Sequence, residues 1–394
     1  MESNDVVIVA AKRTPMGGML GSLSSLSAPE LGAIAHLAAI EEAGISPADI
    51  DEVITGCVLQ AGIGQAPGRQ AAIKAGIPDS AGATTINKMC GSGMKAVMFG
   101  HDLIKAGSAN VVLASGMESM SNAPYLLPKA RSGYRLGHGE LKDHMFLDGL
   151  EDAYDRGKLM GVFAEATAEH YNFSRSQQDE YAVRSMNRAL KAGQDNAFAA
   201  EIAPVVITDR KGNITVNKDE GPDESKLAKI PQLRAAFKAD GTVTAANSSS
   251  ISDGAASLIL MSYAEAKKRG LTPLARIVAH ASHAQEPQWF TTAPVEAIRQ
   301  VMLKAGWNQA DVDLYEINEA FAVVAMAAIK ELELDVDKVN IHGGACALGH
   351  PIGASGARIL VTLIHALKRE HKTRGVAALC IGGGEATAMA LELV

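Results

Sequence analysis

The feature that most constrains the fold of this chain is an approximate internal duplication. Residues 111–116 form an apolar strand pattern that ends in glycine, and residues 377–382 repeat that order near the C-terminus. In each half a glycine-rich turn with a reactive side chain precedes a helix pattern, which leads into this strand and a second glycine turn. Alternating strands and helices favour β/α units. We therefore expect two similar β/α domains whose glycine turns face one shared site.

The hydrophobic periodicity predicts the other elements and a three-part organisation. Helix patterns cover 27–43, 68–75, 174–192, 294–305 and 353–368, and another starts at Glu319. Strand patterns cover 5–10, 50–57, 255–261, 275–281 and 314–317, and Gly212 and Asn213 predict a hairpin turn. Between Met117 and Thr244 the periodicity is weak. We expect an N-terminal half (1–117 plus 245–270), an inserted loop domain (118–244) and a C-terminal half (271–394).

Charge and cysteine content exclude several classes of protein. The net charge is −7, which argues against a nucleic-acid-binding surface. None of the four cysteines belongs to a C-x-x-C pair, so neither a zinc site nor a dithiol motif is expected. The first residues lack the pattern of a signal peptide, and no apolar run is long enough to span a membrane. These features predict a cytoplasmic protein without a membrane partner.

Cys90 lies in the glycine-rich turn that separates a strand pattern from a helix pattern containing Met94 and Val97. A thiol at the N-terminus of a helix faces free backbone N–H groups. These groups lower the thiol pKa and can bind a developing oxyanion. The alternative is a small buried cysteine that only packs in a tight turn. This stretch by itself leaves both interpretations open.

Three further polar residues lie at comparable glycine turns or strand ends: His350, Cys380 and Asn318. Each has a structural alternative, namely a partly buried histidine, a core cysteine and a helix cap. As a set they suit acyl transfer followed by carbon-acid chemistry. The imidazole can activate one thiol as a nucleophile, while the second thiol moves a proton. We interpret Cys57 and Cys346 as structural.

The motifs around these residues resemble those of the thiolase family over essentially the whole chain. Residues 87–95 match its nucleophile segment, 318–322 its Asn-Glu-Ala-Phe box, 343–356 its histidine segment and 380–384 its second-cysteine segment. The box distinguishes the chain from sterol-carrier-type thiolases, and Cys380 distinguishes it from decarboxylating ketoacyl synthases. The resemblance implies the α/β thiolase fold, in which two duplicated β/α domains form a layered α-β-α-β-α core with an inserted loop domain.

The resemblance also implies a ping-pong reaction. Cys90, activated by His350, would take the acetyl group of acetyl-CoA, and Cys380 would remove a proton from C2 of a second acetyl-CoA. The products would be acetoacetyl-CoA and CoA, and the reverse reaction is thiolysis. One oxyanion hole would use His350 and a water held by Asn318, and the other the N–H groups of Cys90 and Gly382. The chemistry needs no metal and no permanently bound cofactor, since coenzyme A is a substrate or product.

Coenzyme A contacts are implied by matching positions in the inserted segment. Ser249 matches the pantetheine-contact turn, Phe237 matches an aromatic residue near the adenine, and Met160 belongs to the same binding region. The chain departs from the family pattern in three places. Leu159 replaces a histidine of many short-chain relatives, residues 219–223 lack an arginine, and Glu385 follows Gly384 where a small residue is commoner. For the missing arginine, the resemblance suggests lysines as substitutes: Lys218, Lys226 and Lys229.

Bulky Trp289 and Phe290 match a segment that lines the family's acyl pocket, and they favour a small acyl group. Their alternative role is packing between domains. The leading hypothesis is condensation of two acetyl-CoA in fatty-acid metabolism, by a homo-oligomer that is a dimer or tetramer. A degradative 3-ketoacyl-CoA thiolase of β-oxidation with broader chain preference is the nearest alternative. A non-catalytic acyl-CoA-binding scaffold would not need Cys90, His350 and Cys380 together.

Overall fold

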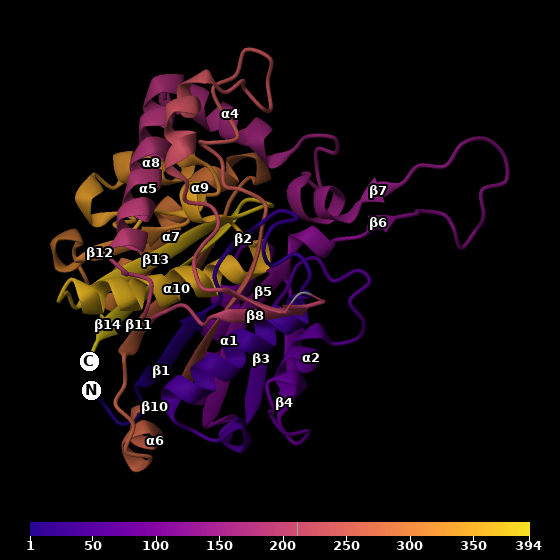
Figure 1. Ribbon diagram of the computed structural model, residues 1–394. Helices are drawn as coiled ribbons and strands as arrows, with labels where there is room; N and C mark the ends of the chain where they lie inside the picture. Colours follow the sequence, from indigo (N-terminus) through magenta and orange to yellow (C-terminus); the bar gives the residue numbers. More distant parts are fainter. Residues whose placement is uncertain (211) are drawn as a thin grey trace.

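The computed structural model describes residues 1–210 and 212–394. A ten-stranded sheet runs through the molecule in the order β12-β13-β14-β11-β1-β10-β5-β3-β4, and the short β2 pairs with β10 (Figure 1). Its strands are β1 (Val6–Arg13), β2 (Gly17–Gly18), β3 (Glu52–Gly56), β4 (Gly82–Ile86), β5 (Val111–Ser119), β10 (Ser252–Ser262), β11 (Ala275–Ala284), β12 (Leu314–Ile317), β13 (Arg374–Ile381) and β14 (Glu385–Leu393).

The sheet consists of two halves with the same topology. In the first, β3 and β5 are parallel, and β5 and β1 lie antiparallel on either side of β10. In the second, β12 and β13 are parallel, and β13 and β11 lie antiparallel on either side of β14. The halves join where β1 pairs with β11 through Val7 and Ile8. This arrangement confirms the duplicated β/α architecture that the sequence predicts.

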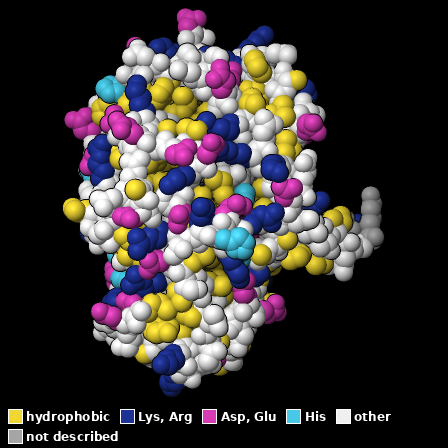
Figure 2. Space-filling model, turned by 90° about the vertical axis from the view of Figure 1, so that its left-hand side faces the viewer, with side chains coloured by type: hydrophobic (Ala, Val, Ile, Leu, Met, Phe, Trp, Pro, Cys, Tyr) yellow, Lys and Arg dark blue, Asp and Glu magenta, His cyan; other side chains and the backbone are white. Residues whose placement is uncertain are grey.

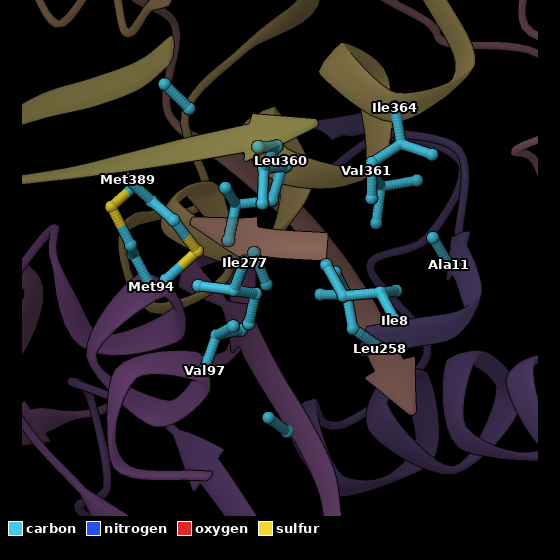
Figure 3. Packing of buried hydrophobic residues seen from close by; sticks show 14 of the residues in the cluster. Ile8, Ala11, Met94, Val97, Leu258, Ile277, Leu360, Val361, Ile364 and Met389 are labelled. Atoms are coloured by element: carbon cyan, nitrogen blue, oxygen red, sulfur yellow. The ribbon is translucent and has the colours of Figure 1, made fainter. Parts of the chain in front are cut away.

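Two buried helices, α3 (Ser92–Lys105) and α10 (Ile352–Arg369), pack against each other and against both halves of the sheet. They approach closely because glycines lie at the crossing: a Cβ on Gly93 would meet the backbone N of Ala357 at 2.7 Å, and one on Gly356 would meet that of Met94 at 2.4 Å. Figure 3 shows the aliphatic and methionine side chains that fill this layer.

The remaining helices cover the outer faces or build the inserted segment. Helix α1 (Ala28–Ala43) packs on β1, β5 and β10, and α7 (Ala293–Ala305) packs on β11 and β14. The other helices are α2 (Pro67–Lys74), α4 (Met160–Tyr171), α5 (Arg175–Gln194), α6 (Tyr263–Lys268), α8 (Ala322–Glu331) and α9 (Ala345–Leu348). Short helical turns are η1 (Pro47–Asp49), η2 (Met120–Asn122), η3 (Phe146–Leu150), η4 (Glu224–Gln232), η5 (Pro287–Thr292), η6 (Gln309–Asp311) and η7 (Val336–Lys338).

The inserted segment also contains two hairpins. Strands β6 (Tyr125–Leu126) and β7 (Lys142–Asp143) carry an arm that projects from the body (Figure 1). Strands β8 (Val205–Asp209) and β9 (Gly212–Val216) form the second hairpin. Within the described residues, no helix has the length and apolar character needed to cross a membrane. On the face shown in Figure 2, acidic and basic side chains are intermixed.

The predicted helices and strands are confirmed, with two corrections. The helix expected from Glu319 begins only at Ala322, because the Glu319 carboxylate is buried and accepts hydrogen bonds from Tyr181, Ser185 and the Cys346 N–H. The predicted hairpin exists, but Gly212 and Asn213 belong to its second strand instead of forming the turn. Residue 211, beside them, lies outside the described residues.

Candidate active site

A cavity of about 580 Å³ lies where the glycine turns of the two halves meet the inserted segment. The structure brings six of the predicted site residues to its wall: Cys90, His350, Gly382, Met160, Phe237 and Ser249. The other two, Asn318 and Cys380, are almost completely buried. Cys380 packs in one apolar cluster with Phe290 and Phe321, which line the cavity. The residues that the sequence singles out therefore surround one space, although Cys90 and Gly382 are 292 positions apart.

Cys90 is held in a tight turn two residues before α3 begins. Met89 adopts a left-handed backbone conformation with φ of 47°, which is uncommon for a side chain of this kind. The Ser92 hydroxyl accepts a hydrogen bond from the Lys88 N–H at 2.8 Å and donates one to the Met89 carbonyl at 2.6 Å. Gly91 packs closely against the Ile381 side chain, whose end a Cβ at this position would displace. The turn thus presses the Cys90 loop against the strand that carries Cys380.

The pKa of the Cys90 thiol lies above its usual value. Burial raises its pKa to about 11, with a further contribution from the negative charge of Glu118, although the N–H groups of Gly382 and of Cys90 itself oppose the shift. The backbone N–H groups lower this pKa as expected, but desolvation outweighs them, so the net pKa of Cys90 is raised. Burial, followed by the nearby Cys90, also raises the pKa of Cys380 well above its usual value. Both sulfurs are neutral thiols at pH 7.

His350 is a neutral base with a defined tautomer. Burial, followed by the positive charge of Arg358, lowers its pKa to about 3. Its Nδ1 lies 2.5 Å from the Ser355 hydroxyl, which itself donates to the Pro351 carbonyl at 2.9 Å. Since that hydroxyl has only one proton, Nδ1 must carry a proton and donate it to Ser355. The Nε2 lone pair is then free to accept a proton.

Asn318 lies beside the imidazole with unused hydrogen-bonding capacity. Its Nδ2 is 3.5 Å from both ring nitrogens of His350, which is too far for a strong hydrogen bond. Its Oδ1 is buried and has no partner among the described residues. Such an orphaned acceptor next to a cavity suits a bound water that donates to it. The neighbouring Glu319 is fixed by its own hydrogen bonds and anchors this loop.

An ion pair connects the two cysteine turns. Glu385, the departure noted after Gly384, begins β14 and pairs with Lys88 in the Cys90 turn. Both side chains are partly exposed. The unusual glutamate therefore has a structural partner in this chain, and it links the nucleophile loop to the loop that follows Cys380.

Glu118 is a buried carboxylate beside the site that motif reading missed. Its oxygens accept hydrogen bonds from the N–H groups of Val58, Leu59 and Gly353, and Cys57 donates its thiol at 3.7 Å. Burial raises its pKa to about 7, and these hydrogen bonds oppose the shift. Because Gly353 lies in the first turn of α10, Glu118 holds the helix start that follows His350. The sequence signal that could have identified Glu118 is its position directly after a buried strand pattern.

The outer part of the cavity differs in detail from the expected coenzyme A contacts. Of the three candidate lysines only Lys226 lines the cavity, together with Leu159. Phe237 packs edge-to-face on Phe321, with ring centres 5.9 Å apart. Of the two bulky residues expected at the acyl end, Phe290 lines the cavity.

Trp289 does not line the cavity with Phe290. Its ring packs against His170 at 5.2 Å between ring centres, and its main chain bonds to Gln285. The alternative role of domain packing therefore fits Trp289, whereas Phe290 remains at the cavity wall.

Comparison with known proteins adds independent information. Residues 6–264 match the family model for the thiolase N-terminal domain, and residues 271–393 match that for the thiolase C-terminal domain. Acetyl-CoA acetyltransferase 2 of Arabidopsis thaliana is 52% identical, covering 99% of this chain and 97% of that protein. The acetyl-CoA acetyltransferase of Bacillus anthracis has a crystal structure that superposes with a TM-score of 0.97 at 42% identity, over 99% of both chains. The Acat5 thiolase of Ascaris suum in complex with coenzyme A superposes with a TM-score of 0.93 at 42% identity, over 99% of this chain and 100% of that one.

Proposed function

Since this chain belongs to the thiolase family, we propose that it is an acetyl-CoA acetyltransferase. It condenses two molecules of acetyl-CoA to acetoacetyl-CoA and CoA, and it catalyses the reverse thiolysis. One observation carries the proposal: Cys90, His350 and the N–H of Gly382 share a cavity wall, with Cys380 buried next to them. This set provides a nucleophile, a base, an oxyanion donor and a second acid–base group in one place.

Acyl transfer to Cys90 uses the His350 tautomer with its proton on Nδ1, which Ser355 stabilises. In thiolysis, Cys90 Sγ attacks the 3-keto carbon of acetoacetyl-CoA while its proton passes to Nε2 of His350. Because both groups are neutral at rest, the proton moves only as the sulfur–carbon bond forms. The N–H groups that hydrogen-bond Sγ, those of Gly382 and Cys90, are placed to receive the negative charge of the adduct.

Cys380 completes the cycle by moving the second proton. The C2–C3 bond breaks, its electron pair goes to C2, and C2 takes the proton of Cys380 to leave as acetyl-CoA. The Cys380 thiolate then removes the thiol proton of CoA. The CoA thiolate attacks acetyl-Cys90, and the departing Cys90 sulfur takes its proton back from His350. Condensation follows the same steps in reverse, with the enolate charge near His350 and the amide N–H of Asn318.

The chain length of the acyl group provides the direct test. We expect thiolysis of acetoacetyl-CoA to be at least about tenfold faster, in kcat/KM, than that of a long-chain 3-ketoacyl-CoA. Phe290, Phe321 and Met160 close the apolar side of the cavity and leave room for a short acyl group. A series from four to sixteen acyl carbons measures this preference. Faster turnover of the long chains would favour the degradative alternative, and no turnover of any would favour a scaffold.

Ser355→Ala is expected to lower kcat for thiolysis by about 10²-fold with little change in KM, because the imidazole loses the acceptor that holds its tautomer and orientation. Steady-state kinetics on acetoacetyl-CoA measure the change, and thermal unfolding checks that the fold is intact. An unchanged kcat in a folded variant would show that Ser355, with the Pro351 carbonyl, does not set the tautomer and orientation of His350. A rise in KM alone would assign Ser355 to substrate binding.

Assembly into a homo-oligomer is part of the proposal. Strand β4 forms the edge of the sheet, and an edge strand is readily extended by a second copy of the chain. The projecting arm exposes Tyr125, Leu136 and Leu141 by 66%, 99% and 65%, which suits a second contact within a tetramer. We expect light scattering to report a tetramer for the parent chain and a smaller assembly for Leu136→Asp/Leu141→Asp. A monomeric parent chain would contradict this.

The proposed setting is a reducing one such as the cytoplasm, because the reaction needs the free thiols of Cys90 and Cys380.

The proposed domain division is an N-terminal half of residues 1–117 plus 245–270, an inserted segment of residues 118–244 and a C-terminal half of residues 271–394. It is supported by the return of the chain to the first half of the sheet through β10. Coenzyme A contacts by Ser249, Phe237 and Met160 are supported by their place on the cavity wall.

A further inference from the structure

A cluster of two histidines and one aspartate lies outside the proposed active site. His101 and Asp102 belong to the last turns of α3, and His280 comes from β11 in the other half of the chain. His101 Nδ1 lies 2.9 Å from Asp102 Oδ1, and His280 Nε2 lies 3.0 Å from that oxygen and 3.2 Å from His101 Nδ1. Three atoms of metal-binding type therefore form a nearly equilateral triangle.

We propose that His101, Asp102 and His280 form a binding site for a divalent transition-metal ion, with zinc as the preferred ion. Zinc binds imidazole nitrogen and carboxylate oxygen at about 2.0–2.1 Å, so it would sit about 1 Å above a triangle of this size. Three protein ligands then lie on one side, and the fourth tetrahedral position is left for water. The two imidazoles and one carboxylate are a common donor set for zinc.

The surroundings allow an ion to enter. Side-chain exposure is 15% for His101, 18% for His280 and 57% for Asp102, so the two imidazoles are partly buried and the carboxylate opens to solvent. The two imidazole rings pack edge-to-face, with ring centres 4.9 Å apart, and His280 Nε2 lies 3.2 Å from His101 Nδ1.

Two lysines near the cluster have other partners. Lys304 Nζ donates to the main-chain carbonyl of His280 at 3.0 Å, and Lys95 Nζ lies 4.7 Å from the centre of the Phe99 ring. Their positive charges weaken cation binding without blocking the triangle. We therefore expect an affinity below that of a four-ligand structural zinc site. Because Cys90 lies at the opposite end of α3, about 15 Å or more along the helix axis, the ion would connect the two halves without entering the reaction.

Cobalt(II) substitution tests the site on the full-length protein in its native assembly. Titration with Co²⁺ at pH 7.5 is expected to give visible d–d bands that saturate at one equivalent per chain. Zn²⁺ is expected to displace them and to raise the thermal unfolding temperature. His280→Gln and His101→Asn are each expected to weaken Co²⁺ binding by at least about tenfold while retaining acetyl-transfer activity, which shows that the variants are folded.

His283→Gln is the matched control, because His283 lies on the same strand but bonds to Gln285. It is expected to bind Co²⁺ like the parent chain. Absence of the d–d bands, or bands that survive both His280→Gln and His101→Asn, would overturn the proposal. A thiolate-to-cobalt charge-transfer band would instead assign binding to cysteine and also overturn it. These outcomes do not depend on which acyl-CoA the enzyme uses.

Discussion

Replacing Cys380 with serine is expected to lower the rate of acetoacetyl-CoA formation by about 10²–10⁴-fold, the usual contribution of a positioned acid–base group. A serine hydroxyl at this buried position cannot take the C2 proton of acetyl-CoA. Acetylation of Cys90 by acetyl-CoA should continue, because that step uses Cys90, His350 and the Gly382 N–H. Mass spectrometry of the intact chain measures acetylation, and a condensation assay measures the second half-reaction.

Cys346→Ser is a suitable control for that experiment. Cys346 is another free cysteine, and its thiol makes only a long contact to the Glu319 carbonyl at 3.8 Å, so serine removes little there. Its condensation rate should stay within a few fold of the parent rate. Loss of both half-reactions in a folded Cys380→Ser variant would contradict the separate roles of Cys90 and Cys380.

Replacing Arg13 with methionine is expected to destabilise the protein by about 3–5 kcal/mol, the usual cost of breaking a buried ion pair from one side. Arg13 lies at the end of β1 and is fully buried. It donates to Glu201 at 2.5 Å and to both carboxylate oxygens of Asp219 at 2.6 and 2.9 Å. Although burial disfavours its charge, Asp219 and Glu201 outweigh burial and raise the Arg13 pKa. Without Arg13, both carboxylates lose their cation inside the fold.

Urea unfolding at pH 7 measures this loss against a matched surface variant. Arg299→Met removes an arginine that pairs with Glu296 and Glu331 but is 46% exposed, so its cost should be about 0–1 kcal/mol. Similar unfolding free energies for the two variants would show that the Arg13 cluster does not hold the inserted segment to β1. Since Asp219 also accepts the Met16 N–H, loss of the cluster should loosen the cavity edge near Gly18.

The pKa values at the site have a consequence for catalysis. Because the pKa of Cys90 is raised to about 11 and that of His350 is lowered to about 3, the resting pair is a neutral thiol and a neutral imidazole. A permanently charged thiolate–imidazolium pair would be costly in this buried space. The N–H groups around Sγ therefore become most useful when substrate brings a carbonyl oxygen that can carry the charge.

Much of the fold and site could be predicted because the signals are local. Apolar strand patterns that end in glycine identified β5 and β13 and thereby the duplication. Glycines around Cys90 and beyond Cys380 marked close backbone approaches, and the structure shows such an approach at Gly93, where a Cβ would meet the backbone N of Ala357 at 2.7 Å. The start of α8 was misplaced because the periodicity of 319–331 does not reveal that the Glu319 carboxylate is buried and bound.

The sequence by itself determined which side chains could act together and on which turns they lie, because strand and glycine patterns depend on neighbours in the chain. Only the tertiary structure decided the protonation of Cys90 and His350, the tautomer held by Ser355 and the partner of Glu385. It also decided that Lys226, of the three candidate lysines, reaches the cavity. The physical reason is that desolvation, charge and hydrogen-bond partners come from residues up to 300 positions apart, and no linear pattern records which of them meet.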